Sequence, residues 1–448
     1  MNLLKGNIRK IYFKYLAAAF GSALITSIYS VVDMAMVGQY QGPDGTAALA
    51  VVAPVWNLIY SLGLLMGIGG SVLYSAGKGS GKSRNGSENQ FFTTSLIGSV
   101  MLAALAWLCL IFFERPLLSF FGGNGTILDL AIQYVKPIKM IFPAFLFNQM
   151  LAAWLRNDND PTLATAAVLS GGIFNIFGDY FFVFACDMGI YGAGLATAIG
   201  SVISLTLMLS HFIKKTNTLS LPKAEGFLTK LRQIFVTGFS TFFIDAAMGI
   251  LTILFNRQIM KYLGSDALSI YGPIINVSTF VQCCAYSVGQ ASQPLISTNY
   301  GAGNGNRIRE TLRLALKTTA VFEIFWTVLS MAVPNLYIRI FMTPPAHILK
   351  IAPAIIRKYS ISFLLLPFNI FSTYYFQSIM KPKASFIVSV SRGLIISGIL
   401  IMVLPSISPN AIWYTMPITE LLVMIYAGTE MKKYTDALPS VTVKLNEA

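Results

Sequence analysis

Residues 161–184 read PTLATAAVLSGGIFNIFGDYFFVF, and this stretch decides the fold class of the protein. Asp179 is its only charged residue. A helix rises about 1.5 Å per residue and crosses the hydrocarbon of a bilayer in roughly 20 residues, so this stretch is long enough to span a membrane. A carboxylate inside such a span is costly, and it therefore indicates a functional site.

Similar apolar runs follow one another from one end of the chain to the other. Of the 448 residues, 55% are hydrophobic and 11% are charged, whereas soluble proteins carry about 25% charged residues. The sequence therefore predicts an all-α integral membrane protein with about twelve transmembrane helices. We expect the spans at 14–39, 46–76, 90–113, 127–153, 161–184, 190–213, 233–260, 266–298, 312–335, 349–379, 384–405 and 410–430.

The basic residues lie mainly in alternate connections between the apolar runs. The net charge is +14, and most of the 32 Lys and Arg fall in clusters at 5–14, 78–84, 214–232, 307–317, 381–392 and 432–444. Positive charge is retained on the cytoplasmic side of membrane proteins. We therefore expect a multi-pass protein with both termini in the cytoplasm, in the plasma (inner) membrane of a prokaryote. The bilayer explains this charge better than nucleic acid does, so we expect no nucleic acid partner.

The two halves of the chain resemble each other, which predicts an internal repeat. Residues 45–57 align without gaps on residues 264–276, and both segments contain a Pro-x-x-Asn motif. Two further matches follow in the same order, 77–81 on 301–305 and Pro161 on Pro382. Six helices per half give both halves the same orientation. We expect two six-helix lobes, 1–220 and 221–448, related by a pseudo-two-fold axis along the membrane normal, with a substrate cavity between them.

Several polar residues inside the spans are expected at one depth in the first half. Asp33 lies within ITSIYSVVDMAMVG, and Asn175 and Asp179 are four positions apart on one helix face. Helix rise places Asp33 and Asp179 at similar heights, and Thr197 enters from the outer side. Such a group of oxygen atoms suits a hard cation such as Na⁺. It suits a proton equally well, because a desolvated carboxylate beside a like charge binds one more readily.

Four motifs stand out along the chain: LRNDNDPTLAT at 155–165, GGIFNIFGDYFFVF at 171–184, MGIYGAGLATAIG at 188–200 and QPLISTNYGAGNGNRIR at 293–309. They resemble motifs of the MATE (multidrug and toxic compound extrusion) family. The pairing of the second and third motifs is similar to the DinF-type branch. The resemblance implies cation-coupled export of organic, often cationic, compounds. It also implies that Asp33, Asn175, Asp179 and Thr197 form a cation-coupling site for H⁺ or Na⁺.

The second half contains two further candidate residues. Asp245 lies about twelve residues into its span, and another MATE branch has an acid in the corresponding helix. That branch has a second acid where this chain has Asn369. We therefore consider Asp245 and Asn369 as residues for substrate or for a second cation.

These observations favour an H⁺- or Na⁺-coupled antiporter that exports small organic compounds by alternating access of the two lobes. The alternative is a flippase for a lipid-linked oligosaccharide or a related lipid. A flippase would need basic residues at mid-depth to hold a pyrophosphate, and only Lys136 and Lys139 are candidates. No cluster of a nucleophile with a base, or of metal ligands, indicates an enzyme. We expect a monomer without a cofactor or a tightly bound metal.

Overall fold

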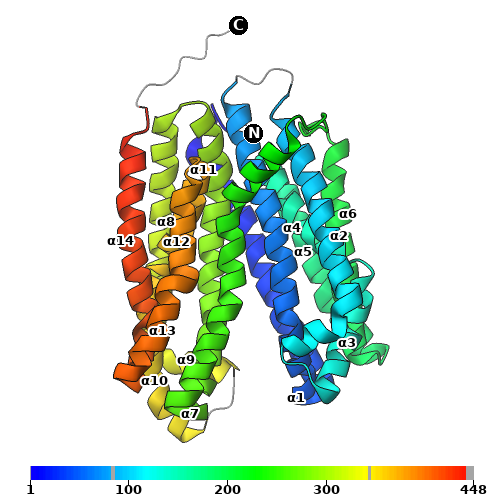
Figure 1. Cartoon of the computed structure of the whole chain (residues 1–448), viewed down its shortest axis with the longest axis vertical. Helices are drawn as coiled ribbons and strands as arrows, with labels where there is room; N and C mark the ends of the chain where they lie inside the picture. Colours follow the sequence, from blue (N-terminus) through cyan, green and yellow to red (C-terminus); the bar gives the residue numbers. More distant parts are fainter. Residues whose placement is uncertain (1, 82–85, 342–344, 440–448) are drawn as a thin grey trace. The chain divides into compact units, whose positions relative to one another are not determined.

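The computed structural model describes residues 2–81, 86–341 and 345–439, and most of these residues are helical (Figure 1). They form two compact units. The N-terminal unit is Ala17–Phe242, and the C-terminal unit combines the residues up to Leu16 with those from Phe243 onward. The predicted all-α membrane fold is confirmed. The basic clusters at 78–84 and 432–444 extend into residues that lie outside the described ranges.

The helices follow the predicted spans closely. The N-terminal unit contains most of α1 (Ile8–Gly79), then α2 (Asn89–Phe120), α3 (Gly125–Lys139), α4 (Phe142–Asn157), α5 (Pro161–Asp179), the π-helix η1 (Tyr180–Ala185), α6 (Gly189–Leu209) and the short helix η2 (Ser210–Ile213). The C-terminal unit contains most of α7 (Phe227–Gly301), then α8 (Gly305–Ala332), α9 (Pro334–Phe341), α10 (Ala346–Ser360), η3 (Ile361–Leu364), α11 (Leu366–Ser378), α12 (Pro382–Val390), the π-helix η4 (Ser391–Ile395), α13 (Ile396–Ile407), η5 (Pro409–Tyr414) and α14 (Thr415–Asp436).

In α1 and α7, a single glycine separates two spans where the sequence predicted a loop. Gly42 has φ 68° and ψ −157°, and Gly264 has φ 80° and ψ −172°. A residue without Cβ adopts such positive φ values easily, so each helix turns there and continues at once. The break in α1 lies at Gly42, three positions before the Gly45 that the sequence alignment paired with Gly264.

The described helices account for twelve spans. Nine continuous helical stretches, α1 and α7 among them, are long and apolar enough to cross a membrane. The pair α3 and α4, bent by 63°, forms one more span. With 72 and 75 residues, α1 and α7 are each long enough for two spans. Counting those two helices twice gives the twelve spans that the sequence predicted.

The first part of α7 packs on α1 within the N-terminal unit, which is why this unit extends to Phe242. A Cβ atom added at Gly69 would lie 2.2 Å from the carbonyl oxygen of Ile234. One added at Gly238 would lie 2.1 Å from the carbonyl oxygen of Leu65. Only glycine allows backbones to approach this closely.

The same kind of contact joins α5 to α6. A Cβ atom on Gly171 would lie 2.4 Å from the Gly200 carbonyl oxygen, and one on Gly200 would lie 2.6 Å from the Gly171 carbonyl oxygen. One turn further along α5, Asn175 faces α6 and donates to the Thr197 hydroxyl. The glycine contact therefore fixes the position of two of the predicted site residues.

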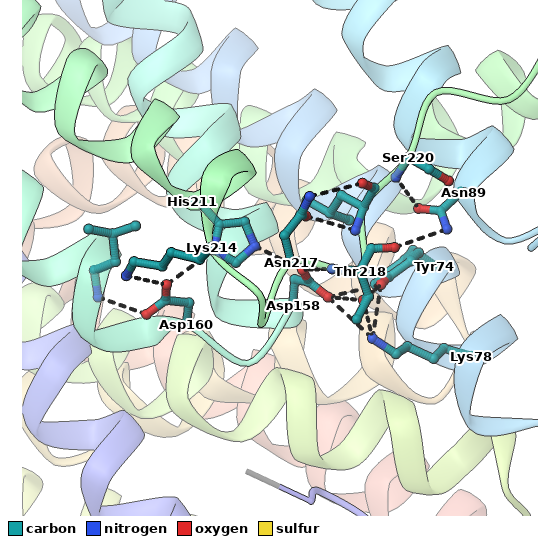
Figure 2. A network of polar contacts seen from close by, with 12 residues as sticks. Tyr74, Lys78, Asn89, Asp158, Asp160, His211, Lys214, Asn217, Thr218 and Ser220 are labelled. Carbon is teal, nitrogen blue, oxygen red and sulfur yellow. Dashed lines mark hydrogen bonds and ion pairs between the residues drawn. The ribbon is translucent and has the colours of Figure 1, made fainter.

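At one end of the N-terminal unit, His211 lies between two carboxylates (Figure 2). Its Nε2 is 2.8 Å from Asp158 Oδ2, and its Nδ1 is 3.1 Å from Asp160 Oδ2. Because ionised carboxylates only accept hydrogen bonds, both ring nitrogens carry protons and the ring is an imidazolium. Lys214 Nζ, 2.8 Å from Asp160 Oδ2, completes this row of alternating charges.

The connection between α6 and α7 is held to the same network. The Thr218 backbone N–H and hydroxyl both donate to Asp158, which also accepts from Tyr74 at 3.1 Å and from Lys78 at 3.2 Å. Burial tends to raise the pKa of Asp158. The hydrogen bonds from His211 and Thr218 and the charge of Lys78 outweigh burial and lower this pKa to about 2.

We expect Gly200→Ala to destabilise the N-terminal unit by about 1–3 kcal/mol, because the added methyl group overlaps the Gly171 carbonyl. Gly398→Ala is the matched control, since a Cβ atom at this helical glycine meets nothing within 4 Å. Helix propensity alone predicts a gain of about 0.5–1 kcal/mol for the control. Thermal unfolding in detergent measures both, and equal effects would contradict the proposed role of the close contact.

We expect Asp158→Asn to lower the free energy of unfolding by at least about 2 kcal/mol at neutral pH. This follows from the drop in the Asp158 pKa from 3.8 to about 2 on folding. The stabilisation is present above about pH 4 and is lost as the pH falls towards 2, so the gap between wild type and variant should narrow there. Asp129→Asn, which removes an exposed ion pair with Arg115, is the control and should change stability by less than about 1 kcal/mol.

Candidate functional site

The predicted site residues of the first half lie together in the interior of the N-terminal unit. Asp33 comes from α1, Asn175 and Asp179 from α5, and Thr197 from α6. The side chains are buried: Asp33 is 8% exposed, Asn175 3% and Asp179 0%. Residues more than 140 positions apart in the chain are thus brought to one place.

Tyr134 on α3 also contacts these residues, although no sequence motif indicated it as a site residue. Its hydroxyl donates to Asp33 Oδ2 at 2.9 Å and lies 3.4 Å from Thr197 Oγ1. Thr197 Oγ1 in turn accepts from Asn175 Nδ2 at 3.1 Å. A continuous line of polar contacts therefore runs from Asp33 to Asn175 through residues of four helices, α1, α3, α6 and α5.

Four buried oxygen atoms of this site make no hydrogen bond to another described residue. They are Asp33 Oδ1, Asn175 Oδ1 and both carboxylate oxygens of Asp179. Buried polar atoms are normally paired, so oxygens left over in a group require an explanation. Carboxylate and amide oxygens are the ligands that hard cations prefer, and a carboxylate also binds a proton. The site therefore suits either Na⁺ or H⁺.

The charges of the site are not balanced by nearby basic residues. Asp33 and Asp179 are close enough for their charges to act on each other. Among the described residues, neither carboxylate forms an ion pair with Lys, Arg or His. Two like charges in an environment of low dielectric constant repel strongly. Binding one proton or one cation relieves this repulsion.

A pocket lies next to the site within the N-terminal unit. It contains about 500 Å³ of empty space, including its open mouth, and Asn175 and Thr197 line it. Tyr29, Tyr60 and Asn148 supply further polar groups to its wall. The Tyr29 and Tyr60 hydroxyls are 3.4 Å apart. Two of the site residues can therefore be approached through a pocket whose wall includes several polar side chains.

The helix changes form immediately after Asp179. This residue ends α5, and η1 follows directly as a π-helix. Single π-turns inside helices occur often at functional sites, because the extra residue changes the direction of the neighbouring side chains. The position of η1 is a second, independent reason to regard Asp179 as functional.

The two candidates of the second half have separate partners in the C-terminal unit. Asp245 Oδ1 accepts from the Tyr286 hydroxyl at 3.1 Å. The Asn369 amide donates to the Glu420 carboxylate at 2.7 Å. No hydrogen bond links Asp245 to Asn369 in the described part of the chain, so these two residues are not joined as the residues of the N-terminal unit are.

Arg392 was assigned to a cytoplasmic connection by the charge pattern, and that assignment is wrong. The side chain is buried, 4% exposed, in the π-helix η4. Arg392 Nε donates to Glu420 Oε1 at 2.8 Å. Sequence spacing alone does not predict this pair, because residues 28 positions apart on different helices meet only through packing. In this unit, a guanidinium thus already neutralises a buried acid.

Comparison with known proteins places this chain in a family. The family profile described as MatE matches residues 18–181 and again 241–404, together well over half of the 448 residues. The two matches also reproduce the internal repeat. The multidrug export protein MepA of Staphylococcus saprophyticus is 23% identical over 381 residues, 84% of this chain and 83% of that protein. The MepA protein of Staphylococcus aureus is 22% identical over 427 residues, 95% of this chain and 93% of that protein.

Solved structures share the whole fold. An outward-facing multidrug resistance MATE family transporter of the MOP superfamily has a TM-score of 0.87 at 19% identity, covering 97% of this chain and 98% of that chain. A MOP superfamily transporter from Pyrococcus furiosus has a TM-score of 0.89 at 19% identity, covering 98% of each chain. That protein is described as having a binding pocket of reverse polarity that suggests a different function. The chain studied here belongs to the MatE family of multidrug and toxic compound extrusion (MATE) transporters.

Proposed function

We propose that this protein is a cation-coupled antiporter that exports small organic, cationic compounds. The observation that carries the proposal is the pair of buried carboxylates, Asp33 and Asp179, with three oxygen atoms that no described residue satisfies. The MepA relatives are named multidrug export proteins, which supports the export of several kinds of drug. The position of these acids in the N-terminal unit favours the DinF-type branch.

The coupling ion is H⁺ or Na⁺, and the site supplies groups for either. A proton would be held by Asp33 or Asp179, with Tyr134 donating to the ionised form of Asp33. A sodium ion would be held by the oxygens of Asp33, Asn175 and Asp179, with Thr197 as a further oxygen donor. In both cases the cation neutralises part of the charge that the site otherwise retains.

Exchange follows if the cation binds one conformation of the lobes better than the other. A ligand shifts a conformational equilibrium only by the difference in its affinity for the two states. Cation binding from outside would favour the state from which substrate has been released, and cation release inside would favour the state that binds substrate. This is alternating access with the coupling site in the N-terminal lobe.

The flippase alternative is not supported. Of the two lysines that could have held a pyrophosphate, Lys139 is paired with Glu114 at 2.7 Å, which removes its free charge. Lys136 is exposed. We further propose that the transporter is a monomer in the plasma membrane of a prokaryote with both termini in the cytoplasm.

We expect Asp33→Asn to lower cation-driven export by roughly tenfold or more, which corresponds to about 1.4 kcal/mol of coupling free energy. Efflux of a cationic dye from proteoliposomes is measured under an imposed pH gradient alone and under an imposed Na⁺ gradient alone. The gradient that drives the wild type identifies the coupling ion. Asp44→Asn is the control, because Asp44 is exposed on the same helix. Undiminished export by the Asp33 variant under both gradients would refute the proposed site.

We expect Tyr134→Phe to change the concentration of the driving cation at half-maximal export by roughly tenfold, because a hydrogen bond to a charged group is lost. The direction depends on the ion. Without its donor, Asp33 binds a proton more tightly, so H⁺-driven export reaches half its maximum at a lower proton concentration. For Na⁺, Asp33 is less firmly oriented and more Na⁺ is needed. Tyr180→Phe, at an exposed tyrosine, is the control, and identical curves for both variants would contradict the role of Tyr134.

A further inference from the structure

A groove lined by basic side chains lies on the C-terminal unit, outside the site described above. Arg9 at the start of α1 and Arg309, Arg313 and Lys317 on α8 line it, and it contains about 820 Å³ of empty space. Glu310 is the only acidic residue in its wall. The groove thus concentrates positive charge at the end of the unit where α1 begins.

Three of these basic residues have no ion-pair partner in the described part of the chain. Arg9, Arg313 and Lys317 are exposed, and none of them forms an ion pair with a described acid. Arg309, Arg313 and Lys317 follow one another at intervals of four on one helix face, where like charges repel by a few tenths of a kcal/mol per pair, about 0.2–0.5. An anion in the groove would relieve this repulsion.

Packing holds the groove open by fixing both of its walls. Arg307 Nη2 donates to the carbonyl oxygens of Leu3 at 3.0 Å and Gly6 at 2.7 Å, which ties the chain before α1 to α8. Ile8 and Tyr12 pack in the same buried cluster as residues of α8, so Arg9 is left on the outer side. The Arg309 guanidinium donates to the carbonyl oxygens of Thr435 and Leu438 at the end of α14. The two segments that carry the basic residues, and the Arg309 guanidinium itself, are therefore held in place before any ligand arrives.

The same face of α8 becomes apolar directly beyond the groove. Val321, Ile324 and Val328 follow Lys317 by four, seven and eleven positions and are 63%, 58% and 58% exposed. These intervals keep them on the face that carries Arg313 and Lys317. Lys317 is the last basic residue of α8, so the charged part of the face ends where the membrane-facing part begins.

We propose that this groove binds the headgroup of an anionic phospholipid, with its acyl chains along the exposed apolar face of α8. Guanidinium and ammonium groups bind phosphate oxygens through charge-assisted hydrogen bonds. Basic pockets at the cytoplasmic ends of transmembrane helices are suited to such headgroups. A soluble phosphate would use the basic groups alone, whereas a phospholipid also covers the adjoining apolar side chains.

The test uses the purified full-length chain in detergent and native mass spectrometry with phosphatidylglycerol and phosphatidylcholine in equal amounts. The wild type should retain phosphatidylglycerol preferentially. The variant Arg313→Gln with Lys317→Gln should bind it roughly tenfold or more weakly, since each basic residue near a charged lipid surface contributes about 1 kcal/mol. Lys383→Gln with Lys432→Gln is the matched control, because both lysines are exposed in the same unit and the charge change is identical.

Two further arms separate a lipid from a soluble anion. Glycerol phosphate, which has the headgroup charge without acyl chains, should not displace phosphatidylglycerol at comparable concentration. Val321→Ser with Val328→Ser should weaken phosphatidylglycerol binding while the basic groups remain. Equal weakening in the groove variant and the lysine control, no weakening in the groove variant, or effective competition by glycerol phosphate would each overturn the proposal. Thermal unfolding of every variant checks that the fold is retained.

Discussion

The structure depends on one constraint: inside hydrocarbon, a polar group must find its partner within the protein. The backbone meets this constraint by remaining helical within each span of α1 and α7. They leave helical geometry only at Gly42 and Gly264, where a residue without a side chain permits a positive φ. The close glycine contacts between α1 and α7 and between α5 and α6 follow from the same need to pack helices tightly.

The same constraint separates the buried acids into those that are satisfied and those that are not. Asp158 accepts from His211, Thr218, Tyr74 and Lys78, and it holds the connection between the two halves in place. Glu420 accepts from Arg392 and Asn369. Fully paired acids of this kind stabilise structure and leave no ligand site. Asp179 differs from these paired acids because both of its carboxylate oxygens lack a hydrogen-bond partner among the described residues. The like charge of Asp33 also acts on it.

The two halves therefore share a scaffold but differ in chemistry. One family profile matches both halves, and the same order of long helices recurs. In the N-terminal unit Asp33 and Asp179 form no ion pair with a described basic residue, whereas in the C-terminal unit Arg392 already neutralises Glu420. In the function proposed above, a reversibly bound cation neutralises the first pair. The repeat explains the architecture, and the departures from the repeat explain where a coupling site can form.

The sequence alone determined the membrane fold and the spans, because apolar runs are local properties. It also selected Asp33, Asn175 and Asp179 as candidate site residues, because the cost of an intramembrane carboxylate is local too. Helix rise was enough to place the acids at one level. Tertiary structure alone revealed Tyr134 between Asp33 and Thr197, and it showed Arg392 as a buried partner instead of a loop residue. Such pairs lie on different helices, and their contact depends on helix rotation and glycine-mediated packing, which no single segment of sequence encodes.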